Sequence, residues 1–248
     1  MVRKVKGKTK AYEKVSLIYQ ELMKDVNYPE WAKYIQRISS EFVGKDAKVL
    51  EFGAGNCKIA NLLSKKFPEI IATDISLPML ESEPKSVVMK VCCDMILLPF
   101  SIKFDLIFST FDSVNYLMSK KRLLALFKQV NYLLEDDGIF TFDASLEKNS
   151  IEFLEDHTVE GSAGSYSFKR VSKFYKSRKV HKNIFYITDA DNNVVKEVHE
   201  QKIFDFETYF DLIFKAGLYV VDCFETFTFK IGSANSDRIQ FILKKTKY

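Results

Sequence analysis

The 248-residue chain lacks long apolar runs and has little glycine, proline or cysteine. No stretch approaches the roughly 18 consecutive apolar residues that a membrane-spanning helix requires, so we expect no membrane partner. Nine glycines and five prolines are too few for a collagen-like or low-complexity chain. The 47% hydrophobic and 28% charged residues are typical of a globular protein with a sizeable core.

The four cysteines and three histidines are too dispersed to predict a disulfide framework or a metal centre. The cysteines form no C-x-x-C pair, and Cys92 and Cys93 are adjacent, so in a strand they would point to opposite faces. The histidines do not cluster with the cysteines in sequence, and we predict no metal site. Free thiols of this kind fit a reducing compartment, which favours the cytoplasm.

Positive charge is concentrated in two segments. Residues 1–14 carry six lysines or arginines against Glu13, and we interpret them as a solvated basic tail. Residues 169–182 carry seven basic side chains and no acid, interleaved with aromatic and branched apolar residues. That second segment is compatible with a nucleic-acid surface, with outward lysines on an exposed strand, or with an acidic or phosphorylated small substrate.

Apolar periodicity predicts two helices, at 12–24 and 31–38, followed by strands that alternate with helices. This alternation predicts a parallel, doubly wound sheet. The predicted strands are 47–52, 70–73, 87–92, 104–108 and 139–142, with helices at 57–67, 76–81 and 120–134. Later strands at 166–175, 183–188 and 194–203 read as antiparallel, before a helix at 206–215 and a final hairpin of 219–229 with 238–244.

These elements predict four successive parts of the chain. Residues 1–46 form the basic tail and two N-terminal helices, and 47–145 form an α/β core. Residues 146–204 form an antiparallel insertion, and 205–248 return to complete the core sheet.

The strongest local signal is the glycine loop after the first predicted strand, in Glu51-Phe52-Gly53-Ala54-Gly55. Glycines permit a tight turn, and the following helix N-terminus presents unsatisfied amides to an anionic group. Asp74 follows Gly53 by 74 − 53 = 21 residues, at the end of the next strand, where a carboxylate accepts the ribose hydroxyls of an adenosine. Both features predict one crevice for an adenosine-containing cofactor.

These motifs resemble those of the class I S-adenosylmethionine-dependent methyltransferases. The resemblance rests on the glycine loop, on Asp74 within Thr73-Asp74-Ile75-Ser76 and on Asp94-Met95, and it covers nearly the whole chain. It implies a seven-stranded Rossmann-like sheet with a terminal antiparallel hairpin, S-adenosylmethionine as cofactor and S-adenosylhomocysteine as product. The helices within 1–46 resemble the lid helices of bacterial members that methylate small molecules, and the insertion 146–204 resembles their substrate cap. This implies a small-molecule acceptor. A monomer and a homodimer both stay open.

The resemblance also implies cofactor roles for individual residues. Gly53 and Gly55 would lie beside the methionine moiety, Asp74 on the ribose and Ile75 against the adenine. The other residues implied at the cofactor are Tyr19, Trp31, Glu51, Ala54, Asp94 and Met95, of which Asp94 and Met95 would lie at the adenine amine. The family usually has a third glycine where this chain has Cys57, and we expect a small side chain to be tolerated there, in the first turn of the helix.

Several alternatives stay open at this point. An NAD(P)-binding oxidoreductase would need glycine at position 58 of its G-x-G-x-x-G fingerprint, where this chain has Lys58. A methyltransferase of this fold could act on RNA or protein through residues 169–182, and a non-catalytic adenosine sensor would share the crevice. Positioning supplies about 7 to 11 kcal/mol of the barrier reduction for methyl transfer. If a general base contributes, Asp112 and Tyr116 are favoured, with the histidines as further candidates.

Overall fold

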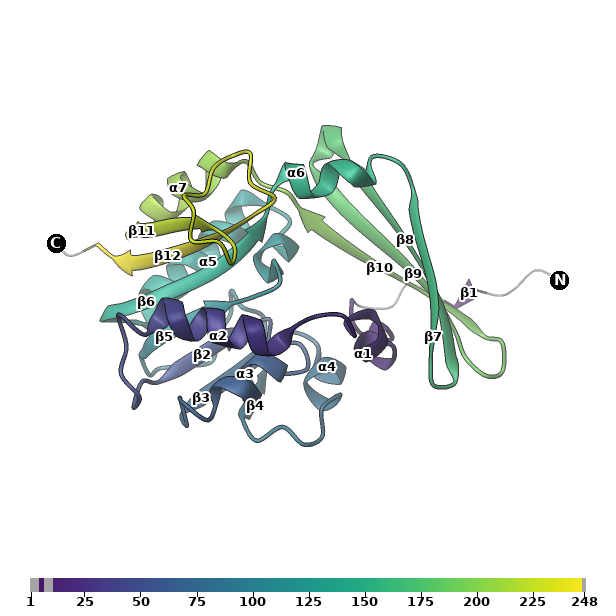
Figure 1. The fold of residues 1–248 in the computed structure, drawn as a ribbon, viewed down its shortest axis with the longest axis horizontal. Coiled ribbons are helices and arrows are strands. Elements are labelled where there is room, and N and C mark those ends of the chain that lie inside the picture. The colour runs from purple at the N-terminus through teal and green to yellow at the C-terminus, as the bar shows by residue number, and fades with distance from the viewer. Residues whose placement is uncertain (1–4, 7–10, 247–248) are drawn as a thin grey trace.

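The computed structural model describes residues 5–6 and 11–246. It contains an α/β body and a second, antiparallel sheet that lie side by side along the long axis of the molecule, with the described N-terminal segment between them (Figure 1). Within the described residues, no helix is long and apolar enough to span a membrane.

The body is built on a seven-stranded sheet with the order β11-β12-β6-β5-β2-β3-β4. Strands β2 to β6 pair in parallel, β12 runs antiparallel to β6, and β11 runs antiparallel to β12. The strands are β2 (Val49–Phe52), β3 (Ile70–Asp74), β4 (Met89–Cys92), β5 (Phe104–Ser109), β6 (Leu134–Ser145), β11 (Leu218–Glu225) and β12 (Arg238–Lys245). The predicted doubly wound sheet with a terminal antiparallel hairpin is confirmed.

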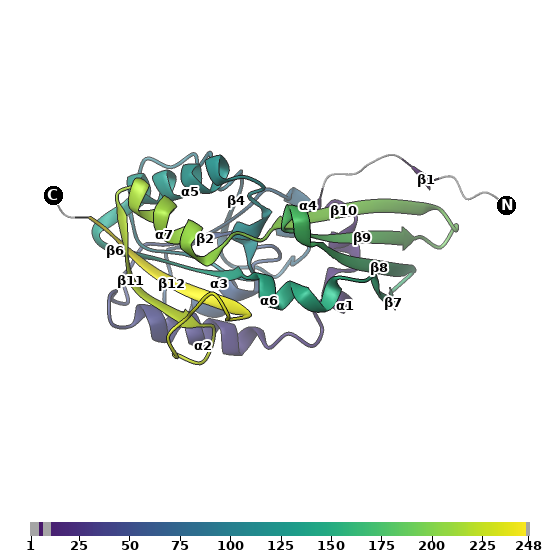
Figure 2. The ribbon, with the colours of Figure 1, turned by 90° about the horizontal axis from the view of Figure 1, so that it is seen from above.

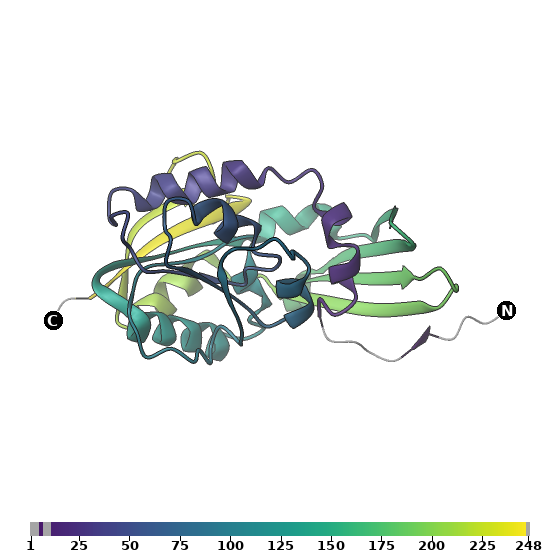
Figure 3. The ribbon, with the colours of Figure 1, turned by 90° about the horizontal axis from the view of Figure 1, so that it is seen from below.

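Helices cover both faces of this sheet, as the two opposite views show (Figures 2 and 3). One face packs against α2 (Tyr28–Ser39), α3 (Lys58–Leu63) and α4 (Leu77–Glu81), and the other against α5 (Lys120–Leu133) and α7 (Phe206–Lys215). Helix α2 begins where the Asn27 side chain accepts the backbone N–H of Glu30. Its apolar stripe is buried because Ile35 and Ile38 face the sheet side of the helix.

The second sheet has the order β1-β10-β9-β8-β7. Its strands are β1 (Val5–Lys6), β7 (His157–Ala163), β8 (Tyr166–Tyr175), β9 (Val180–Thr188) and β10 (Val194–Lys202); the short helices α6 (Glu147–Ser150) and η3 (Ile151–Phe153) lead into it, and η4 (Lys176–Arg178) lies between β8 and β9. Strand β7 had no counterpart in the prediction. Its residues alternate between exposed and partly buried positions, but the partly buried ones are the small Val159, Gly161 and Ala163, so the apolar side of the pattern is weak.

The predicted solvated tail is wrong for Val5–Lys6, which pairs in parallel with Val194 and Val195 of β10. The tail residues Arg3, Lys4, Lys8 and Lys10 lie outside the described residues. The predicted helix at 12–24 is also broken, into η1 (Val15–Leu17) and α1 (Tyr19–Leu22).

The break in that helix has a tertiary cause. The fully buried Glu197 carboxylate on β10 accepts the backbone N–H groups of Tyr12, Lys14 and Val15. Residues whose N–H groups are bound to a distant carboxylate adopt the local backbone that this contact requires, so the contact overrides helix propensity. The N-terminal segment is therefore fixed across the second sheet, directly above the cavity described below.

Candidate cofactor and acceptor site

The loop after β2 alternates through the left-handed region of the backbone. Gly53 has φ +61°, Gly55 has φ +54° and Cys57 has φ +62°. A Cβ at Gly53 would lie 2.7 Å from the Cβ of Ser113, so this glycine is required both by its backbone and by the closeness of η2 (Ser113–Tyr116). The backbone of the loop therefore lines the crevice at the carboxyl ends of β2, β3 and β5.

The position of Cys57 relative to helix α3 differs from the sequence prediction. It is the N-cap of α3 and not a residue of its first turn, and its left-handed backbone is the one that favours glycine. The side chain is fully buried in the apolar cluster beneath α3, and burial raises its thiol pKa to about 12. Burial of the thiol offsets the backbone strain of about 1 to 2 kcal/mol that a non-glycine residue carries there.

Asp74, at the end of β3, joins two loops of the crevice. Its Oδ2 accepts the backbone N–H of Gly55 at 2.8 Å, and its Oδ1 accepts the backbone N–H of Ser76 at 2.8 Å. Burial raises the pKa of Asp74 above its usual value, although these backbone N–H groups oppose the rise. Each oxygen keeps a lone pair, so the carboxylate can still accept two hydroxyl groups.

The crevice around the loop contains further polar atoms without partners. Among the described residues, Glu51 Oε2 and Asn56 Nδ2 are buried and make no hydrogen bond. Burial raises the pKa of Glu51 well above its usual value. Buried polar atoms are normally satisfied, so a polar ligand in this crevice would complete them.

Two further predicted residues follow β4. Asp94 accepts the backbone N–H of Ile96 at 3.1 Å and forms an ion pair with Arg122 at 2.7 Å, and with Met95 it lines the crevice.

Ile75, which follows β3, also lines the crevice. Its side chain is 65% exposed, which is unusual for an isoleucine and leaves an apolar surface for a planar ring. Ala54, Gly53 and the other loop residues complete this wall.

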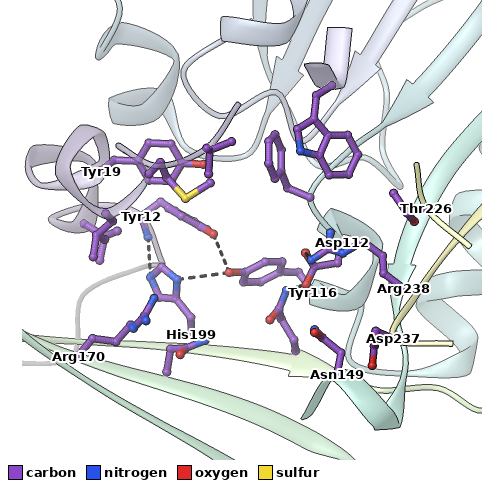
Figure 4. Close-up of a pocket in the computed structure, with 18 of the residues that line it drawn as sticks. Tyr12, Tyr19, Asp112, Tyr116, Asn149, Arg170, His199, Thr226, Asp237 and Arg238 are labelled. Atoms are coloured by element: carbon purple, nitrogen blue, oxygen red, sulfur yellow. Dashed lines mark hydrogen bonds and ion pairs between the residues drawn. The ribbon is translucent and has the colours of Figure 1, made fainter. Parts of the chain in front are cut away.

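A second, larger cavity of about 770 Å³ adjoins the crevice (Figure 4). Four aromatic residues line both spaces: Tyr12, Tyr19, Phe111 and Tyr116. Trp31, predicted at the cofactor, lies in the wall of the larger cavity, where its ring meets Phe111 and Phe227 with centroids 4.6 Å apart in both cases. The second sheet, the N-terminal segment and the β11–β12 loop enclose this cavity.

A hydrogen-bonded chain crosses the boundary between the two spaces. Tyr12 Oη lies 2.6 Å from Tyr116 Oη, and Tyr116 Oη lies 3.4 Å from Nδ1 of His199 (Figure 4). His199 Nε2 lies 2.7 Å from Oε1 of the buried Glu197. The backbone N of Tyr12 lies 3.3 Å from Nε2, but its N–H also donates to the Glu197 carboxylate, the stronger acceptor. The carboxylate therefore favours a proton on Nε2, which leaves Nδ1 as an acceptor for the Tyr116 hydroxyl. Burial raises the phenol pKa of Tyr116 and keeps this hydroxyl neutral.

Asp112 lies opposite this chain, held in a buried charge network. Arg238 contacts Asp112 Oδ1 at 2.9 Å and also pairs with the fully buried Asp143, whose Oδ2 accepts the backbone N–H of Asp112. Gln201 donates to Asp112 Oδ2 at 2.7 Å. Burial lowers the pKa of Arg238, but the two carboxylates raise it further, so the net shift is upward. Burial raises the pKa of Asp143 to about 6 in spite of Arg238.

We expect Arg238→Gln to destabilise the protein by about 3 to 5 kcal/mol, because it leaves the carboxylate of Asp143 buried without its counter-charge. Urea unfolding followed by circular dichroism measures this loss. Lys148→Gln is the matched control, since the Lys148–Asp237 pair is exposed and should contribute less than about 1 kcal/mol. Equal unfolding free energies for the two variants would contradict the expected role of the network.

Comparisons with known proteins agree with this architecture. Residues 49–138 match a family model described as a methyltransferase domain. The chain is 26% identical over 245 residues to the "Putative methyltransferase YqeM" of Bacillus subtilis (strain 168), which covers 95% of this chain and 98% of that protein. A solved S-adenosylmethionine-dependent methyltransferase from Clostridium acetobutylicum ATCC 824 is similar at 22% identity, with a TM-score of 0.80 over 95% of this chain and 99% of that one.

A further solved structure is similar over the full length. The sugar N-methyltransferase KedS8 from Streptoalloteichus sp. ATCC 53650 has a TM-score of 0.77 at 16% identity, and the match covers 99% of this chain and 100% of that one.

The chain contains a methyltransferase domain and has the fold of the class I S-adenosylmethionine-dependent methyltransferases. Its methyltransferase domain, at residues 49–138, contains the glycine loop, Asp74 and Asp94, and S-adenosylmethionine is its cofactor. The resemblance drawn from the sequence is therefore confirmed, and the NAD(P)-dependent alternative is set aside.

The sequence named His199 only as one of three candidate histidines, and it did not single out Glu197 or Gln201, which the structure places beside it on β10. Glu197, His199 and Gln201 alternate along β10, which is the one local signal that their side chains share a face. Alternation alone does not say that this face lines a cavity, and Tyr12 and Arg238 reach the same cavity from the two ends of the chain.

Proposed function

We propose that this enzyme methylates a small molecule bound in the 770 Å³ cavity. The observation that carries the proposal is the shared wall: Tyr12, Tyr19, Phe111 and Tyr116 face both the cavity and the cofactor crevice. A volume of this size is within the range of small-molecule sites, about 300 to 1,000 Å³. Residues 146–204 then act as the cap that shapes the acceptor pocket.

The residues around the crevice fit the cofactor. Asp74 accepts the two ribose hydroxyls, Gly53, Ala54 and Gly55 lie along the methionine part, and Glu51 provides the unpartnered carboxylate oxygen. The adenine side is formed by Ile75, Asp94 and Met95. Tyr19 closes the crevice toward the cavity, whereas Trp31 belongs to the acceptor side. When bound, S-adenosylmethionine supplies an electrophilic methyl group for in-line displacement.

The Tyr116–His199 chain supplies a path for the proton of the acceptor. The Tyr116 hydroxyl accepts that proton and passes its own to Nδ1 of His199, whose charge the Glu197 carboxylate then stabilises. Tyr12 holds the Tyr116 hydroxyl in place at 2.6 Å. Asp112 is committed to Arg238 and Gln201, so we assign it a positioning role.

The basic segment 169–182 gives little support to a nucleic-acid substrate. All five of its lysines form ion pairs with acids on neighbouring elements: Lys169 with Glu160, Lys173 with Asp156, Lys176 with Glu147, Lys179 with Glu147 and Asp205, and Lys182 with Glu200. Such pairing cancels most of the positive field that phosphate binding requires. The similarity of the fold to that of KedS8, a sugar N-methyltransferase, further supports a small acceptor.

Incubation of the protein with methyl-labelled S-adenosylmethionine and a bacterial cell extract tests this function. The extract is separated into small-molecule, RNA and protein fractions before the reaction. We expect label in the small-molecule fraction. The Asp74→Ala variant is the control and should transfer no label. Label confined to the RNA or protein fraction would overturn the proposal.

A further inference from the structure

Arg170 is the member of the basic segment that points into the molecule. Along β8, Ser172 and Phe174 are buried, and Arg170 shares their face by strand alternation. The adjacent Lys169 and Lys173 lie on the other face, where they pair with acids. Arg170 lines the large cavity and lies beside His199 (Figure 4).

The charge of Arg170 is not compensated. Three basic side chains line the cavity, and two have acidic partners: Lys148 pairs with Asp237, and Arg238 pairs with Asp112. The guanidinium of Arg170 has no ion pair or hydrogen bond with any residue that the structure describes, and its Nε is buried without a partner. Burial alone accounts for the lowering of its pKa. A desolvated, unpartnered guanidinium is unfavourable unless a ligand completes it.

The acids of the cavity are already engaged and do not serve as partners for Arg170. Of the lining acids, Glu225 accepts the Ser236 hydroxyl, while Asp112 and Asp237 have the basic partners named above. Glu197 is fully buried and does not line the cavity; it binds His199 and three backbone N–H groups. On the neighbouring strand, Asn183 also lines the cavity and accepts from Ser172 through its carbonyl oxygen. Its NH₂ group is therefore a second donor beside Arg170.

We propose that the methyl acceptor carries an oxyanion, a carboxylate or a phosphate, which binds to Arg170. This inference rests on the proposed small-molecule function and names the chemical class of its substrate. A guanidinium presents two parallel N–H groups that match either oxyanion, and in a partly desolvated wall such charge-assisted bonds are strong. Arg170 holds one end of the acceptor in the same cavity wall that carries His199, so it orients the other end toward Tyr116.

Trp31, the single tryptophan of the chain, lines the same cavity and reports its occupancy by fluorescence. The protein loaded with S-adenosylhomocysteine is titrated separately with inorganic phosphate and with acetate, which distinguishes the two anions. We expect a saturable change with at least one of them, and in Arg170→Gln a dissociation constant about 10- to 100-fold higher. Arg178→Gln, the control, should bind as the wild type does, because Arg178 stacks on Tyr175 outside the cavity. No saturable change in the wild type, or unchanged binding in Arg170→Gln, overturns the proposal.

A second assay uses pairs of candidate acceptors that differ only in the anion, such as an amino acid and its amide, or an amino alcohol and its phosphate ester. We expect methylation of the anionic member, with KM raised about 10- to 100-fold and kcat little changed in Arg170→Gln. Methylation of neutral members with equal KM in both proteins would overturn the anion site but leave the small-molecule function standing. Label confined to RNA or protein, together with loss of phosphate binding in Arg170→Gln, would overturn the function but keep the anion site.

Discussion

Asp74→Ala is expected to weaken S-adenosylmethionine binding by about 10² to 10⁴-fold. Hydrogen bonds to a charged group are worth about 1.5 to 3 kcal/mol each, and the variant removes two that the ribose hydroxyls would make. It also removes the acceptor of the Gly55 N–H, so the glycine loop loses one of its anchors. Isothermal titration of the purified variant with S-adenosylmethionine measures the effect.

Asp105→Ala is the matched control for this variant. Asp105 lies near the opposite end of β5, and its carboxylate also accepts a backbone N–H, that of Lys48, at 2.8 Å. The control should therefore lose a similar local contact and keep its cofactor affinity. A folded Asp74→Ala protein that binds the cofactor as tightly as the wild type would refute the assignment of the ribose site.

The same carboxylate gives cofactor binding a pH dependence. Burial raises the pKa of Asp74 above its usual value, and the protonated form accepts hydroxyl groups less well. Affinity should be complete above the raised pKa and fall as the pH drops through it, at a less acidic pH than an exposed aspartate would show. In Asp74→Asn, which has no such titration, this part of the pH dependence should be absent.

His199→Gln is expected to lower kcat by about 10² to 10⁴-fold, the usual contribution of a general base, without changing cofactor affinity. Nδ1 of His199 accepts the hydrogen bond of the Tyr116 hydroxyl. A glutamine at position 199 has no group that can take up a proton. Tyr116→Phe removes only the hydroxyl that joins His199 to the acceptor, and it should lower kcat by a comparable factor. Initial rates with the acceptor found in the extract measure both.

Two controls separate proton transfer from packing in this experiment. His157→Gln changes an exposed histidine of β7 and should leave kcat unchanged. The loss in His199→Gln should appear in kcat and not in the KM of the acceptor, a split that a purely structural role would not cause. Wild-type kcat in both His199→Gln and Tyr116→Phe would show that the acceptor needs no base.

The sequence predicted the cofactor side of the site because that side is built from short-range order. The glycine loop, Asp74 and Asp94 each follow a strand of the parallel sheet, and parallel strands bring their carboxyl ends to one edge. The order of strands and helices therefore determines which residues meet there. The sequence predicted the ends of strands less well: it places a strand at 139–142, whereas β6 extends from Leu134 to Ser145.

The acceptor side depended on contacts between distant parts of the chain. Tyr12 meets Tyr116 across 104 residues, and Arg238 meets Asp143 across 95 residues, so no local pattern announced either pair. Alternation along β8 separates Arg170 from its neighbouring lysines, but it does not say which face lines a cavity. Only the packing of the second sheet against the body decided that, because burial assigns a strand's faces and the sequence period does not. The sequence thus determined the fold class and the residues of the crevice, while the tertiary structure decided which residues line the adjoining cavity and which charges face it.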